Sequence, residues 1–135
     1  MPKTMPSVDE WLREAKVDPG FRNCGMYLVH NGTVRETPKA EARDIETDGV
    51  QPGGKVGGMV FSYDSTRVEA AVETCRALPG IGYVRVWLNE GELALGDDIM
   101  LVLIGGDIRP RVIDALQQLV GAIKNECVSE VEREA

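Results

Sequence analysis

The residue in this sequence best suited to chemistry is Lys124, which lies near the end of a predicted C-terminal helix. At about 100° of rotation per residue, the helix from Pro110 to about Asn125 gathers its apolar side chains into one arc, and Lys124 falls at the edge of that arc. The apolar arc consists of Ile113, Leu116, Val120, Ile123 and Cys127. A lysine there can reach out to water, where the helix dipole favours it. Alternatively it borders a pocket, where burial lowers its pKa and suits it to act as an acid, a base or a nucleophile.

Two arginines, Arg109 and Arg111, precede or open the same helix, at its junction with an apolar strand. Such strand-to-helix junctions often face a ligand in layered folds. Two guanidinium groups beside a helix N-terminus suit an anionic group. We therefore predict that Arg109 and Arg111 bind an anionic small molecule.

The only histidine is His30, and the three cysteines are Cys24, Cys75 and Cys127. His30 lies in a strand pattern, which favours a core or edge histidine over a catalytic base, a Ser-His-Asp member or a metal ligand. No CxxC spacing occurs, so the sequence offers neither a zinc ribbon nor a thioredoxin-like motif. We expect three reduced thiols and no metal site.

The elements that position these residues follow from apolar periodicity and turn residues. Ser7 and Glu10 form a capping-box pattern before a short helix. The predicted elements are a helix over 8–16, a strand over 24–34 buried on both faces, a loop over 35–58 with a possible strand near 43–47, a strand over 59–63, a helix from 65 to 78, a strand over 83–88, a turn or short strand over 90–97, a central strand over 98–104 and the helix over 110–125. This order predicts an α+β fold or a layered α/β sandwich.

The composition restricts the partners. The chain has 135 residues and a net charge of −7, which argues against nucleic acid and anionic membranes as general partners. Its length fits one domain. The N-terminus is too charged for a secretory signal, and no apolar run approaches the ~20 residues of a membrane span. We expect a cytoplasmic, single-domain protein.

Two segments, GMYLVHNGTVR (25–35) and VRVWLNEGELALGDDIMLVLIGGDIR (84–109), resemble the large, catalytic subunit of molybdopterin synthase. Residues 25–35 resemble that family's apolar strand running into G-x-V-R. Residues 84–109 resemble its strand, G-x-L-x-x-G-[DE] block, second strand and arginine before a helix. The last helix then aligns without a gap to the family helix that ends in an active-site lysine. The likeness covers about residues 20–125, which identifies the chain as a divergent member.

The resemblance implies an α/β hammerhead fold with a mixed sheet and packed helices. Within one domain over 1–135, it suggests an N-terminal helix over 1–20, a synthase-like core over 21–125 and an acidic tail over 126–135. It implies a homodimer within a heterotetramer, in which each large subunit binds a small ubiquitin-like sulfur carrier. The carrier's C-terminal Gly-Gly, as a thiocarboxylate, donates sulfur twice to cyclic pyranopterin monophosphate, an anionic pterin, to give molybdopterin. No cofactor or metal is required in that transfer.

By position in the motifs, Arg35 and Arg109 match the family's arginines and Lys124 matches its active-site lysine. The resemblance thus predicts that these three residues border one pocket, with Lys124 as the proton-transfer or covalent group. Other positions depart from the family. Leu88-Asn89 and Ile108 replace family histidine and arginine residues, Val131 falls where a second active-site lysine would be, and the tail is acidic. Two functions remain open: a divergent synthase subunit, or a non-catalytic paralogue that binds the carrier or serves in assembly.

Overall fold

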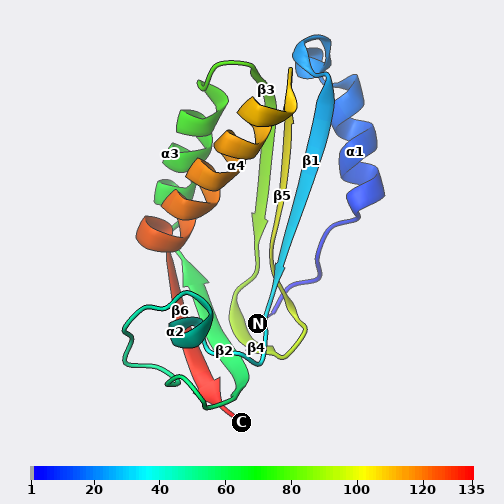
Figure 1. Cartoon of the computed structure of the whole chain (residues 1–135). Helices are drawn as coiled ribbons and strands as arrows, with labels where there is room; N and C mark the ends of the chain where they lie inside the picture. The colour runs from blue at the N-terminus through cyan, green and yellow to red at the C-terminus, as the bar shows by residue number, and fades with distance from the viewer. Residues whose placement is uncertain (1) are drawn as a thin grey trace.

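Two three-stranded antiparallel sheets form the framework of the protein (Figure 1). The computed structural model describes residues 2–135. The first sheet has the order β1 (Met26–Thr33), β5 (Asp98–Gly106), β3 (Ile81–Leu88), and the second has the order β4 (Gly91–Ala94), β2 (Val56–Tyr63), β6 (Val128–Glu134). The α+β class is confirmed, but every strand pair is antiparallel, so the expectation of a mixed sheet is wrong.

β5 is the central strand of the first sheet, as its unbroken apolar sequence predicts. Residues 99–106 of β5 are all buried, because helices cover both faces of this sheet. The prediction that the segment 24–34 is buried on both faces is wrong. Its strand, β1, pairs only with β5, so it forms an edge, and Val29 remains 37% exposed.

Helices cover the first sheet from both sides (Figure 1). α1 (Val8–Val17) packs Trp11 and Ala15 against one face, and the side chain of Ser7 accepts the predicted cap hydrogen bond from Glu10 N. A 3₁₀ turn over Pro19–Asn23 leads from α1 towards β1. α3 (Ser65–Arg76) and α4 (Arg109–Ala122) cover the opposite face, where the main core lies. Within residues 2–135, no helix combines the length and apolar character needed to cross a bilayer.

The buried face of α4 differs from the predicted arc. The helix packs against both the sheet and α3, so its buried residues are Val112, Ala115 and Leu119, while Ile113 is 40% exposed. The helix widens after Ala122 into a π-helical turn over Ile123–Cys127. This turn keeps Ile123 and Cys127 buried and leaves the side chain between them, Lys124, half-buried.

The long polar segment after β1 contains a short helix, α2 (Lys39–Ala42), and no strand near 43–47, so that expectation is wrong. β2 also begins earlier than predicted, at Val56. Gly57 and Gly58 belong to β2 rather than to a loop. A Cβ at Gly57 would lie 2.8 Å from Ala135 Cα, and one at Gly58 would lie 2.6 Å from Leu93 O. Glycine therefore lets the neighbouring backbones approach β2 closely.

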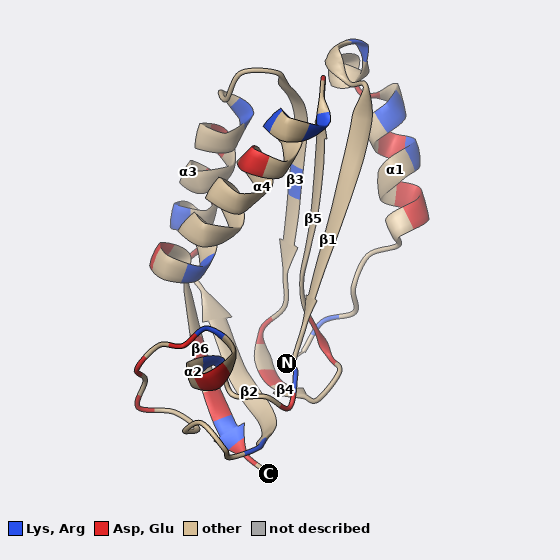
Figure 2. Ribbon diagram, in the orientation of Figure 1, with Lys and Arg blue, Asp and Glu red and all other residues tan. Residues whose placement is uncertain are grey.

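The acidic residues at the C-terminus form β6, for which the sequence analysis assigned no element. β6 pairs along the length of β2, from Tyr63↔Val128 to Val56↔Glu134. Its charged positions lie beside α2 in the lower part of the molecule (Figure 2). β6 therefore belongs to the second sheet and brings carboxylates to the segment that follows β1.

Candidate functional site

A cavity of about 500 Å³ lies where the end of α4, β1, α2 and β6 meet. Six charged side chains line it: Arg35, Lys39, Arg43, Lys124, Glu130 and Glu132. A second hollow of about 490 Å³ lies between α3 and α4, but its lining is mainly apolar. It includes Cys75, whose pKa burial raises to about 11, so that thiol is protonated at neutral pH. The charged cavity is therefore the better candidate for chemistry.

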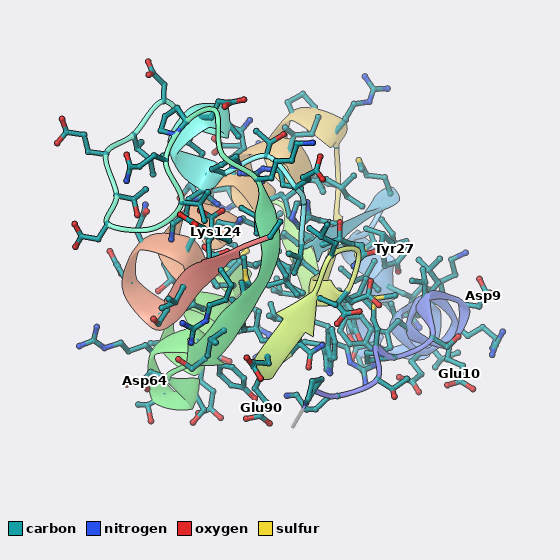
Figure 3. All side chains as sticks on the ribbon, turned by 90° about the horizontal axis from the view of Figure 1, so that it is seen from below. Asp9, Glu10, Tyr27, Asp64, Glu90 and Lys124 are labelled. Carbon is teal, nitrogen blue, oxygen red and sulfur yellow. The ribbon has the colours of Figure 1, made fainter. Side chains whose placement is uncertain are left out.

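Lys124 occupies the cavity wall from the π-helical turn that ends α4 (Figure 3). Among residues 2–135, no hydrogen bond or ion pair engages its ammonium. Burial lowers its pKa from the ordinary value of a lysine. Glu130 opposes this shift, whereas the positive charges of Arg43 and Arg35 add to it. Lys124 is thus half-buried, and its ammonium loses its proton more readily than that of an exposed lysine because its pKa is lowered.

Arg35 reaches the cavity from the segment directly after β1. The backbone on its N-terminal side is fixed, because Val34 N donates to Asp97 O at 3.0 Å and Val34 O accepts from Gly96 N at 2.9 Å. On the other side, Glu36 O accepts a hydrogen bond from Val56 N at 2.8 Å. Among residues 2–135, no hydrogen bond or ion pair engages the exposed side chain of Arg35, so its guanidinium is free to bind a ligand.

Lys39 and Arg43 are site residues that the sequence analysis missed. Lys39 lies at the start of α2 and Arg43 just after its end. Both line the cavity, and both lower the pKa of Lys124 through their positive charges. The available signal was the four-residue spacing between Arg35 and Lys39 and between Lys39 and Arg43. Such spacing places side chains on one face only in a helix, and the segment was expected to be a loop.

His30 lies on β1 and also lines the cavity. Burial and the positive charge of Lys124 both lower its pKa, so the imidazole is neutral at pH 7. Gly32, two residues further along β1, keeps this wall open, because a Cβ there would lie 3.1 Å from Met100 Cγ and 3.9 Å from His30 Nε2. His30 is therefore the edge-strand histidine that the pattern favoured, and its side chain faces the cavity.

Arg109 and Arg111 lie at the opposite end of α4 from Lys124. At about 1.5 Å of rise per residue, roughly 20 Å of helix separates them from the cavity. Arg111 Nη1 donates to Asp107 Oδ2 at 2.8 Å, an i,i+4 pair at the helix start. The prediction that Arg35, Arg109 and Lys124 border one pocket is therefore wrong within a single chain, because one straight helix keeps its two ends apart.

Val131, at the position expected from the resemblance to hold a second lysine, does not line the cavity and is 47% exposed. Alternate residues of a strand point to opposite faces, so Glu130 and Glu132 face the cavity while Val131 faces away. Within residues 2–135, no three His, Cys, Asp or Glu side chains are grouped to hold a metal ion. The arrangement suits binding an anion beside a lysine that can transfer a proton or form a covalent bond.

No model of a protein family matches the chain, and no curated protein resembles it in sequence. Solved structures do resemble its fold. Molybdopterin synthase from Staphylococcus aureus matches with a TM-score of 0.69 at 17% identity, over 96% of this chain and 87% of that one. The molybdopterin biosynthesis MoaE protein from Burkholderia ambifaria matches with a TM-score of 0.65 at 18% identity, over 98% and 84%. A complex of subunits 1 and 2 of molybdopterin-converting factor from Helicobacter pylori matches with a TM-score of 0.61 at 14% identity, over 96% and 82%. At these identities the likeness establishes the fold.

Proposed function

We propose that this protein, which shares its fold with molybdopterin synthase and MoaE structures, is a divergent catalytic subunit that transfers sulfur to cyclic pyranopterin monophosphate. The observation that carries the proposal is the meeting of Lys124 and Arg35 in one cavity, although 88 residues separate them in sequence. These are two of the three positions that the family motifs assign to the active site. The donor is the thiocarboxylate of a small carrier protein, and the product is molybdopterin.

Both reactants are anionic, because the pterin carries a phosphate and the carrier ends in a thiocarboxylate. Arg35 has free N–H donors to hold one of these anions. Lys124 has a lowered pKa, so it gives up a proton more readily than an exposed lysine. Its ammonium donates a proton to the reacting group, and the neutral amine that remains takes up a proton again in the following step. The transfer needs no metal or cofactor, and the proposed setting is the cytoplasm.

The proposed assembly is a homodimer, with each copy bound to one ubiquitin-like carrier that ends in Gly-Gly. The H. pylori neighbour is a protein–protein complex of two subunits, which supports a small-subunit partner. Arg109 cannot reach the cavity of its own chain. If Arg109 binds substrate, as its place in the motif suggests, the second copy must supply it.

The test is a single-turnover assay with thiocarboxylated carrier and cyclic pyranopterin monophosphate. We expect molybdopterin from the wild-type protein and at least ~10²-fold slower formation with Lys124→Ala, the usual effect of removing a general acid or base. Lys124→Arg should not restore the rate, because a guanidinium keeps its proton. Lys16→Ala, which changes an exposed lysine on α1, is the matched control. Full activity in Lys124→Ala would refute the role of Lys124.

The second candidate is a non-catalytic paralogue that binds the carrier or serves in assembly. It is favoured by Val131, which leaves the cavity without the second lysine, and by the two carboxylates on β6 that line it. This candidate predicts that the wild-type protein binds the carrier but forms no molybdopterin in the same assay.

A further inference from the structure

The two glutamates of β6 present a contradiction in a cavity proposed to hold anions. Glu130 and Glu132 both line it, and their carboxylates would repel a phosphate or a thiocarboxylate. Both are also buried: the side chain of Glu130 is 8% exposed, and Glu132 as a whole is 8% exposed. Burying a carboxylate costs free energy unless a partner compensates it. The partners of these two residues therefore indicate what they do.

Apart from the backbone pairing with β2 and the attraction between Glu130 and Lys124, the contacts of these two glutamates among residues 2–135 are with α2 or the residue that follows it. Glu132 Oε2 accepts a hydrogen bond from Lys39 N at 2.9 Å, at the first turn of α2. The backbone oxygen of Glu130 accepts from Lys39 Nζ at 2.7 Å. The carboxylate of Glu130 lies 3.9 Å from Arg43 Nη2. The glutamates thus hold the two ends of one short segment against β6.

After these contacts, Lys39 and Arg43 still have N–H donors that can bind a ligand. The ammonium of Lys39 has three N–H donors, and one of them donates to Glu130 O. The guanidinium of Arg43 has five donors, and its pairing at 3.9 Å is an ion pair rather than a direct hydrogen bond. With Arg35 and Lys124, the cavity has four cations against two carboxylates, a net charge of +2 in a chain of net charge −7.

We propose that Lys39 and Arg43 are substrate-binding residues of this cavity, and that Glu130 and Glu132 act as positioning residues that hold them beside Lys124. The ligand is a phosphomonoester or thiocarboxylate anion, so the inference rests on the proposed function for the identity of its substrate. In this arrangement the carboxylates of β6 interact with the α2 segment and do not repel the bound anion. Instead, β6 compensates for the missing second lysine by fixing cations that come from a different part of the chain.

Buried apolar residues hold the α2 segment in place. The positive charges of Lys39 and Arg43 can therefore be removed without moving the segment. Pro38 and Ala40 are buried on either side of Lys39, and Val50 is buried within the following loop. These residues keep the segment in place when a cationic head is removed. Lys39→Met and Arg43→Met therefore change the charge of the cavity while keeping the aliphatic part of each side chain.

The first experiment measures binding of inorganic phosphate by isothermal titration calorimetry, which requires no turnover. We expect Lys39→Met and Arg43→Met each to weaken binding about tenfold, the usual effect of losing a charge-assisted hydrogen bond. Lys16→Met, which removes an equal charge from α1, should leave binding within twofold. Unchanged phosphate affinity in both α2 variants would refute the inference.

The second experiment tests Glu132 as a positioning residue by a double-mutant cycle with Lys39→Met, because Glu132 Oε2 accepts the hydrogen bond from Lys39 N. Glu132→Leu should weaken phosphate binding, and the double variant should bind little worse than either single variant, because both act through the same cation. Additive losses would refute a positioning role. Glu132→Gln keeps an oxygen that accepts from Lys39 N, so it should bind phosphate nearly as well as the wild-type protein, and it provides the test if Glu132→Leu does not fold.

Turnover separates this inference from the proposed function. In the sulfur-transfer assay, Arg43→Met should raise KM for the pterin about tenfold with kcat within threefold, whereas Lys124→Ala should lower kcat. Phosphate binding that depends on Arg43 without any molybdopterin formation would refute the proposed function and support the anion site. Turnover with an unchanged KM in Arg43→Met and Lys39→Met would support the proposed function and refute the role of α2.

Discussion

Replacing Lys124 by methionine should separate the catalytic value of this lysine from its cost to folding. Lys124 is half-buried, and its ammonium makes no hydrogen bond or ion pair with residues 2–135. Methionine keeps the length and most of the apolar surface but removes the charge. We expect turnover to fall ~10²-fold or more, equivalent to about 2.7 kcal/mol of transition-state stabilisation. We expect the free energy of unfolding to rise by about 0.5 kcal/mol, because a half-buried unpaired charge no longer has to be desolvated.

The pH dependence gives this prediction a definite sign. Burial lowers the pKa of Lys124 in the folded state, so between that lowered pKa and the ordinary value of 10.5 the unfolded chain binds more protons than the folded one. The contribution of Lys124 to the free energy of unfolding therefore rises with pH across this window. The methionine variant lacks it, so its stability advantage at pH 7 should shrink as the pH approaches 10.

The assay is urea unfolding of both proteins at pH 7 and pH 10, read by tryptophan fluorescence and fitted by linear extrapolation. Lys16→Met serves as the control, since that lysine is exposed and should show no change in stability or turnover. A methionine variant destabilised by more than about 1 kcal/mol at pH 7 would show that Lys124 makes a stabilising interaction, which would refute the reasoning. An advantage that grows towards pH 10 would refute the sign of the shift.

Three further predictions concern the core, the thiols and the assembly. Phe61→Ala should cost about 3–5 kcal/mol in urea unfolding, because Phe61 is 1% exposed at the centre of β2; an intact midpoint would place it outside the core. Cys75, with a pKa of about 11, should resist thiol reagents at pH 8 in the folded protein and react in urea, and fast native labelling would contradict its burial. Mixing Arg109→Met with Lys124→Ala should restore part of the turnover that each variant lacks, because one cavity of a mixed dimer receives both native residues. Light scattering that gives a mass of 14.7 kDa at high micromolar concentration would exclude that dimer.

Local patterns in the sequence were sufficient for most of the elements. The capping box at Ser7 and the unbroken apolar run of β5 each predicted an element that the structure confirms. These signals work because a side-chain cap bonds backbone groups within three residues, and a continuous apolar run bounded by turn residues favours a strand. Helical periodicity suggested Lys124 as a site residue, and the resemblance to the family motif suggested Arg35; both line the cavity.

Other features depended on packing between distant segments. Which face of α4 is buried was decided by its position between α3 and the sheet, so the buried face is rotated from the predicted arc: Ile113 is exposed, whereas Ile123 and Cys127 are buried as expected. The edge position of β1 left Val29 exposed, although its sequence resembles a buried strand. Periodicity reports how apolar residues are spaced, whereas their burial depends on which elements cover them.

The composition of the cavity is likewise a property of the tertiary structure. The sequence alone determined a lysine at the end of an apolar stripe and an arginine after a strand. It gave no reason to place Lys39 and Arg43 beside them, or to read the acidic tail as a strand. Pairing of β6 with β2 brings Glu130 and Glu132 within reach of α2, more than 85 residues earlier in the chain. Such contacts depend on strand register and charge pairing across the fold, which no local window of sequence contains.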